Sequence, residues 1–226
     1  MLTLKLSDLF GHHTQTTVED KIKQYVSIMS SVTPSIPGFR TKFAKFFGLN
    51  QTDWAIKSVI TGTGTWMDGH IRMEVFFEIF DRYMKMPKTA VSYDCIIEDL
   101  SKVPMKNGKG KVQVSFSSKL LHGVDNDKPI IDQKMLLKLA LPFSGFTSSI
   151  ALKVIGKKKP VAHIGSGTQA DSISFYCNLE AYYGILKSMP STISYITDFD
   201  IWCRSKGIDL SLISDTKKID FWMWLA

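Results

Sequence analysis

The sequence has too few cysteines, and too short an apolar run, for several common protein classes. Cysteine occurs at three positions, an odd number at long and irregular spacing: Cys95, Cys177 and Cys203. This spacing predicts neither a disulfide framework nor a thiolate metal site, and it favours a reducing compartment. The most apolar window, residues 135–146, is interrupted by Lys138 and Pro142 and falls below the roughly 20 apolar residues of a membrane-spanning helix. We therefore expect any contact with a membrane to be made at its surface.

The first ten residues lack the pattern of a secretory signal. Lys5 and Asp8 interrupt their apolar stretch, and no small-residue cleavage site follows. We expect no export by that route.

Motifs that mark an enzyme or a metal centre are scarce as well. No histidine pair has the spacing of a helical zinc site, and no G-x-S-x-G or G-K-[ST] motif occurs. Residues 165–170 match the dinucleotide pattern G-x-G-x-x-[GA], but no alternation of strands and helices surrounds them, which favours an ordinary turn. Asp125, Asp127 and Asp132 lack the glycine and the closing glutamate of a calcium loop. We expect no enzymatic activity, no cofactor and no metal.

The composition is that of a chain that folds as one domain with a hydrophobic core. Of its 226 residues, 44% are hydrophobic, 22% are charged and 12% are aromatic. Lysine and arginine number 28 against 21 acidic residues, which gives a net charge of +7. This balance favours encounters with phosphates, anionic lipids or acidic partners.

The N-terminal part of the chain predicts a helix followed by a hinge. Val18, Ile22 and Tyr25 recur at helical spacing within residues 14–31. Prolines and hydroxyl residues then fill the segment up to residue 38, which is typical of a loop. We expect a flexible N-terminal segment over residues 1–38 and a globular, matrix-like domain over residues 39–226.

The globular part predicts a mixture of strands and helices. Period-two alternation and β-branched or aromatic residues indicate strands in the following ranges: 53–60, 71–80, 111–117, 135–141, 149–155, 208–213 and 219–225. Residues 172–186 are ambiguous but favour a helix, and residues 197–207 have the capping pattern of a short helix. The expected fold class is α+β, a single compact domain with a twisted, mainly antiparallel sheet packed by helices.

One short segment combines positive charge with large aromatic side chains. Within residues 39–48, Arg40, Lys42 and Lys45 alternate with Phe39, Phe43, Phe46 and Phe47. A surface-binding amphipathic element needs both apolar area to bury and charge to attract anionic lipid. The predicted membrane-binding set is Phe39, Arg40, Lys42, Phe43, Lys45, Phe46, Phe47, Lys157, Lys158 and Lys159.

Two alternatives to this membrane interface stay open. The phenylalanines could pack on the sheet while the lysines are solvated. The same lysines could also bind nucleic acid non-specifically, since no base-reading motif is present.

The second half of the chain contains VSFSSKLLH at 114–122, KP at 128–129, LPFSG at 141–145, IALKVI at 150–155 and TDF at 197–199, with Trp202, Gly207, Ile208 and Trp222. These stretches give the chain a resemblance to the matrix proteins of rhabdoviruses, with the last five features in the order of that family's terminal helix and hairpin. It implies a viral structural protein that binds the inner membrane leaflet, self-associates, condenses the nucleocapsid and drives assembly and budding. The partners implied are an anionic lipid membrane, the viral nucleocapsid, a viral glycoprotein tail and further copies of the chain. The implied location is the virion beneath its envelope, with the host cytoplasm and the inner face of host membranes.

The chain departs from this family in its late-budding motifs. Neither P-P-x-Y nor P-[ST]-A-P occurs, so recruitment of host budding factors through those motifs is in doubt. A non-specific nucleic-acid-binding viral accessory or movement protein is the alternative from another class. A small enzyme that uses the loop at 165–170 ranks last.

Overall fold

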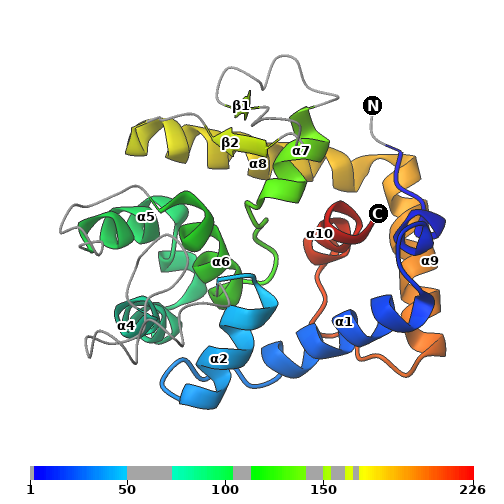
Figure 1. The fold of residues 1–226 in the computed structure, drawn as a ribbon, viewed down its shortest axis with the longest axis horizontal. Coiled ribbons are helices and arrows are strands. Elements are labelled where there is room, and N and C mark those ends of the chain that lie inside the picture. Colours follow the sequence, from blue (N-terminus) through cyan, green and yellow to red (C-terminus); the bar gives the residue numbers. More distant parts are fainter. Residues whose placement is uncertain (1–2, 50–72, 104–112, 141–149, 154–160, 165–167) are drawn as a thin grey trace. The chain divides into compact units, whose positions relative to one another are not determined.

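The protein is mainly helical. The computed structural model describes residues 3–49, 73–103, 113–140, 150–153, 161–164 and 168–226 (Figure 1). Its elements are, in chain order, η1 Leu6–Phe10, α1 Gln15–Met29, α2 Pro37–Phe46, α4 Met73–Met84, η2 Lys88–Ala90, α5 Tyr93–Lys102, α6 Val114–Val124, α7 Gln133–Ala140, β1 Ile150–Lys153, β2 Val161–Ile164, α8 Gln169–Ser188, α9 Pro190–Ser205 and α10 Asp215–Leu225. None of the described helices is both long enough and apolar enough to cross a membrane.

The expected α+β fold with a twisted antiparallel sheet is wrong. Within the described residues, β structure is confined to the short antiparallel pair β1 and β2, in which Ile150 lies opposite Ile164 and Lys153 opposite Val161. Four segments that the sequence predicted as strands are the helices α4, α6, α7 and α10. The strand predicted at 208–213 is a loop between α9 and α10, and the strand predicted at 149–155 contains β1. The strand predicted at 53–60 lies outside the described residues.

Helical spacing of buried side chains explains why these segments are not strands. In α4, Phe76, Phe80 and Tyr83 lie on one buried face, four and three residues apart. In α6, Phe116 and Leu120 repeat this spacing. The aromatic and branched residues that favour strands in isolation are therefore used here to fill a core between helices, and packing outweighs local propensity.

Side-chain caps fix where two of the reassigned helices begin. Asp132 accepts a hydrogen bond from the Met135 backbone N–H at 2.7 Å, at the start of α7. Ser214 accepts one from the Lys217 N–H at 3.1 Å, at the start of α10. Each cap satisfies a backbone donor that has no partner within the helix.

The helices predicted over 14–31 and 197–207, and the helix favoured over 172–186, are confirmed as α1, α9 and α8. The amphipathic segment 39–48 lies largely in the helix α2. Helix α9 begins earlier than predicted, at Pro190, which suits the first turn because it needs no backbone N–H there. Gly207 follows the helix with a φ of 65°, a conformation that glycine adopts without strain.

The chain divides into two compact units. Unit 1 comprises Met1–Val26 and Asn126–Ala226, and unit 2 comprises Ser27–Asp125. The division differs from the boundary at residue 38 that the sequence suggested. Residues 3–26 contribute to the core of unit 1: the rings of Tyr25 and Phe221 lie 5.6 Å apart, and the Trp222 indole donates to Asp8 at 3.0 Å.

The core of unit 2 is a cluster of phenylalanines from three helices. Phe43 of α2 lies 5.1 Å from Phe80 of α4, and Phe76 lies 5.9 Å from Phe116 of α6, centroid to centroid. Gly123 lets α6 approach this cluster, because a Cβ at that position would come within 2.3 Å of the Phe80 ring.

Candidate membrane interface

Helix α2 has an aromatic face that belongs to the core of unit 2. Phe43 is fully buried and Phe39 is 7% exposed. Their rings contact the α4 phenylalanines, with Phe39 6.4 Å and Phe43 6.0 Å from Phe77. In this conformation the aromatic side chains hold α2 in place and do not face solvent.

The opposite face of α2 is cationic. Lys42 and Lys45 are exposed and lie three residues apart, so they share one side of the helix. The helix contains no acidic residue. Within the described residues, no carboxylate lies within ion-pair distance of either lysine. Both charges are therefore free to meet an anionic surface.

Most other exposed cations in the described part of unit 2 are neutralised. Lys85 pairs with Asp81 at 2.5 Å and Lys102 pairs with Glu98 at 2.7 Å. Exposed ion pairs of this kind contribute little to stability, but they cancel the local charge. Lys42 and Lys45, like Lys88, have no such partner among the described residues.

Arg40 plays a different part from the two lysines. Its Nε donates to the Pro34 carbonyl at 2.5 Å, and its guanidinium carbon lies 5.6 Å from the centre of the Phe77 ring. These contacts hold the arginine against its own unit. Its charge still adds to the field of the face.

Of the predicted membrane-binding residues, the structure places only some at the surface. Phe39, Phe43 and Phe47 are buried and Phe46 is half-buried, with its ring 5.0 Å from that of Phe47. Lys157, Lys158 and Lys159 lie outside the described residues, so whether they join the lysines of α2 stays a prediction.

Ile36 is an exposed apolar side chain at the start of α2 that the sequence analysis missed. It precedes Pro37 at the start of α2 and is 52% exposed. The signal in the sequence was the proline, which is favoured at the first helical position and therefore places the preceding residue outside the helix. Ile36 is therefore an apolar side chain of this segment that is exposed, unlike the buried phenylalanines.

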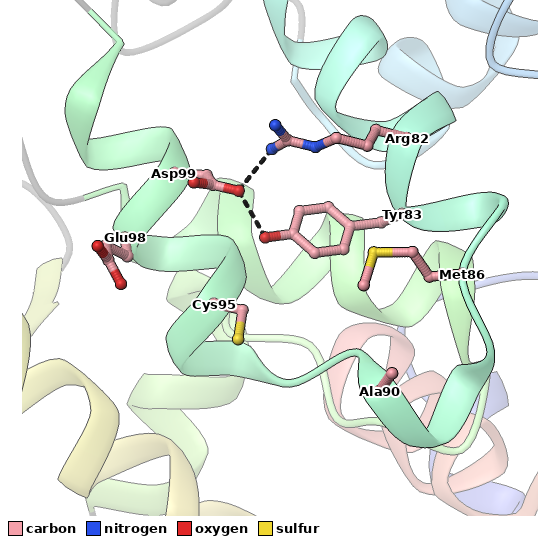
Figure 2. A pocket seen from close by; sticks show the side chains of 7 residues that line it. All are labelled: Arg82, Tyr83, Met86, Ala90, Cys95, Glu98 and Asp99. Atoms are coloured by element: carbon pink, nitrogen blue, oxygen red, sulfur yellow. Dashed lines mark hydrogen bonds and ion pairs between the residues drawn. The ribbon is translucent and has the colours of Figure 1, made fainter.

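A second surface feature of unit 2 is an open pocket of about 310 Å³. Its lining residues are Arg82, Tyr83, Met86, Ala90, Cys95, Glu98 and Asp99. Figure 2 shows Arg82 and Tyr83 reaching the same carboxylate oxygen, that of Asp99, at 2.5 and 2.6 Å.

The polar groups of this pocket are committed to one another. Burial, and then the hydrogen bond to Asp99, raise the pKa of Tyr83 well above its usual value, so its hydroxyl stays protonated. The Ser92 hydroxyl lies 3.2 Å from the Cys95 sulfur. The pocket is therefore held together by contacts between its own side chains, and these contacts indicate no class of ligand.

No group of three potential metal ligands from histidine, cysteine, aspartate and glutamate occurs among the described residues. Two of the three aspartates of the calcium-like pattern have structural roles. Asp127 accepts a hydrogen bond from Thr216 at 2.7 Å, and Asp132 caps α7. Likewise, Thr168 from the glycine-rich loop caps α8 by accepting from the Asp171 N–H at 3.2 Å.

No family model, curated protein or solved structure matches this chain. The resemblance to rhabdovirus matrix proteins therefore stays a prediction.

Proposed function

We infer that the chain is a structural protein that attaches to the surface of anionic membranes through the outer face of α2. The observation that carries this proposal is the pair Lys42 and Lys45, exposed on a helix without acidic residues. The opposite face of that helix is fixed to its unit by Phe39 and Phe43. A rigid helix whose cations have no carboxylate partner in the described part of the chain suits a flat anionic surface better than it suits a small ligand.

The strength of this attachment follows from the few groups involved. Each basic residue near an anionic membrane contributes about 1 kcal/mol, so Lys42 and Lys45 contribute about 2 kcal/mol together. Partial burial of Ile36 adds no more than about 1 to 2 kcal/mol. One copy therefore binds weakly, and stable attachment requires several copies bound side by side, since linked weak contacts multiply.

This requirement fits the matrix-type role implied by the resemblance. Self-association on the inner leaflet, condensation of the nucleocapsid, assembly and budding belong to that proposal, as does a location beneath the virion envelope. The resemblance supports these roles only through the order of its residues, because residues 114–122 and Trp222, which it matched to a strand and a hairpin, lie in the helices α6 and α10. Insertion of Phe39, Phe43 and Phe47 is not part of the proposed mechanism, because these rings form the core.

The test is co-flotation of the purified chain with neutral and with anionic liposomes, at low and at high salt. We expect flotation with anionic vesicles that falls as salt rises, because exposed charges are screened. The variant Lys42→Glu/Lys45→Glu should lose most of this binding.

A matched control is Lys21→Glu/Arg204→Glu, which changes the net charge equally at two exposed positions of unit 1 that have no carboxylate partner among the described residues. This control should float like the wild type. An equal loss in both variants would mean that net charge alone drives binding, and it would remove α2 from the mechanism. Absence of flotation together with a salt-sensitive shift of single-stranded RNA would contradict the proposal and favour nucleic-acid binding.

A further inference from the structure

Helix α10 buries charged side chains of both signs. Lys217 and Asp220 have no solvent-exposed surface, and they lie three residues apart on the same side of the helix. The helix contacts η1, α7, α8 and α9, so neighbours from several parts of unit 1 surround it. Buried charges are costly unless they are paired or neutralised. Whether Asp220 is charged or neutral therefore determines how the helix responds to pH.

The Asp220 carboxylate is only partly satisfied. Its Oδ1 accepts a hydrogen bond from the Tyr183 hydroxyl at 2.7 Å. Its Oδ2 is buried and has no hydrogen-bond partner of ordinary geometry among the described residues. The Ile130 backbone also interacts with this carboxyl and favours its charged form. A carboxylate in such a place is less stable charged than neutral, because the lost hydration is not replaced.

Lys217 lies among aromatic rings. Its Nζ is 3.7 Å from the centre of the Trp224 ring and 4.9 Å from the centres of Tyr25 and Phe221. Contacts of this kind stabilise a cation through the negative faces of the rings. The positive charge of Lys217 also favours the charged form of Asp220.

The other ionisable groups around Asp220 come from several elements. Tyr183 from α8 favours the charged carboxylate, and Asp132, just before α7, favours the neutral acid. Tyr25 from α1 and Tyr195 from α9 also feel the Asp220 charge, and burial raises the pKa of both far above neutral. These tyrosines therefore keep their protons across the range in which Asp220 titrates.

More distant charges bind other parts of α10. Asp8 from η1 accepts from the Trp222 indole at 3.0 Å, and Lys134 and Lys138 from α7 donate to the carbonyls of Trp224 and Ala226 at 3.0 and 2.5 Å. They hold the C-terminal end of the helix without contacting the Asp220 carboxyl.

We propose that Asp220 is a proton-sensitive latch, which holds α10 in its place when the carboxyl is protonated and loosens the helix when that proton is lost. The carboxyl lies where the latch requires it, on the buried side of α10 and bonded to α8. This inference concerns unit 1 and is independent of the membrane interface proposed on α2.

The titration of Asp220 falls in the physiological range. Burial is the main cause that raises its pKa from the usual 3.8 to about 7. The folded state therefore holds this proton up to about neutral pH, whereas the exposed carboxyl loses it near pH 4. The stability contributed by this group is fully present below about pH 4, where both states hold the proton, and it is lost progressively as the pH rises from there to the folded pKa of about 7.

The test is amide hydrogen exchange of the full chain, corrected for the intrinsic pH dependence of exchange. Protection of α10 should fall by more than about tenfold between about pH 5.5 and about pH 8.5, while protection of α8 and α9 changes less. In Asp220→Asn, which keeps the shape but cannot ionise, protection of α10 should be independent of pH. The control Asp198→Asn removes a charge from an exposed position of α9 and should behave like the wild type.

Tyr183→Phe provides a second variant in case Asp220→Asn does not fold. It removes the hydrogen bond that favours the charged carboxylate, so the midpoint of the pH profile should move to higher pH. The same pH profile for α10 in the wild type and in Asp220→Asn would overturn the proposal. So would an equal fall of protection in α8, α9 and α10, because it would indicate unfolding of the whole unit.

Discussion

Helices α2 and α10 are similar in length and carry two non-terminal lysines each among aromatic residues, yet they place these charges on opposite sides. In α2, Lys42 and Lys45 face solvent while the phenylalanines face the core. In α10, Lys217 and Lys218 are both buried together with the aromatic side chains.

The cause of this difference is the number of neighbours. Helix α2 has one covered face, which the phenylalanines occupy, and its lysines take the side that remains. Helix α10 is surrounded, so its charges have to be satisfied inside. Lys218 forms ion pairs with Asp200 and Asp215, each at 2.8 Å. Lys217 instead lies over aromatic rings, which stabilise its charge. The same residue types thus give an exposed cationic face in one helix and a charged interior in the other.

The largest expected effect comes from removing the core side chain that anchors α2. Phe43→Ala deletes a fully buried ring that touches four others, those of Phe39, Phe47, Phe77 and Phe80. The cavity should lower the free energy of unfolding by about 3 to 5 kcal/mol. Chemical denaturation with a probe of unit 2 measures this loss.

The control for Phe43 is its half-buried neighbour. Phe46→Ala should cost clearly less, because less of its ring leaves water on folding. If Phe46→Ala were the more damaging of the two, the assignment of α2's inner and outer faces would be wrong.

A pH-dependent effect is expected from Lys217→Met, which removes the buried cation of α10 and keeps its length. Near pH 8.5 the variant leaves the Asp220 carboxylate without the nearby positive charge that favours its charged form, so the free energy of unfolding should fall most there. Near pH 5.5 Asp220 is largely neutral, so the cost should be smaller. Thermal unfolding at both pH values checks this. A cost that is the same at both values would show that the two side chains are not coupled.

Sequence reasoning succeeded where one local pattern dominates. The helices α1 and α2 carry single apolar stripes, and residues 172–186 and 197–207 were assigned as helices from local pattern and capping signals. It failed for α4 and α10, whose aromatic and branched residues also suit a strand. In α10 the misleading feature is burial on nearly every side, because a helix surrounded by neighbours shows no clear apolar and polar faces.

The candidate interface was predictable only in part. The sequence identified Lys42, Lys45 and the phenylalanines as one amphipathic segment, but periodicity cannot tell whether an apolar face meets lipid or the rest of the protein. The cluster with Phe77 and Phe80 settles this, and it depends on residues more than thirty positions away. The Asp220 latch was not predicted, since nothing local marks a buried aspartate.

The smallest expected effect on stability is that of Lys42→Ala/Lys45→Ala. A small effect is expected because the lysines of α2 are exposed, whereas those of α10 are buried. Both side chains are exposed and have no carboxylate partner among the described residues, so their removal should change the free energy of unfolding by no more than about 0.5 kcal/mol. The same variant should weaken binding to anionic vesicles by roughly thirtyfold, the equivalent of about 2 kcal/mol. Denaturation and flotation of one preparation measure both quantities. A large loss of stability would mean that the lysines of α2, like those of α10, are part of the folded interior, and unchanged flotation would mean that they are not the membrane contact.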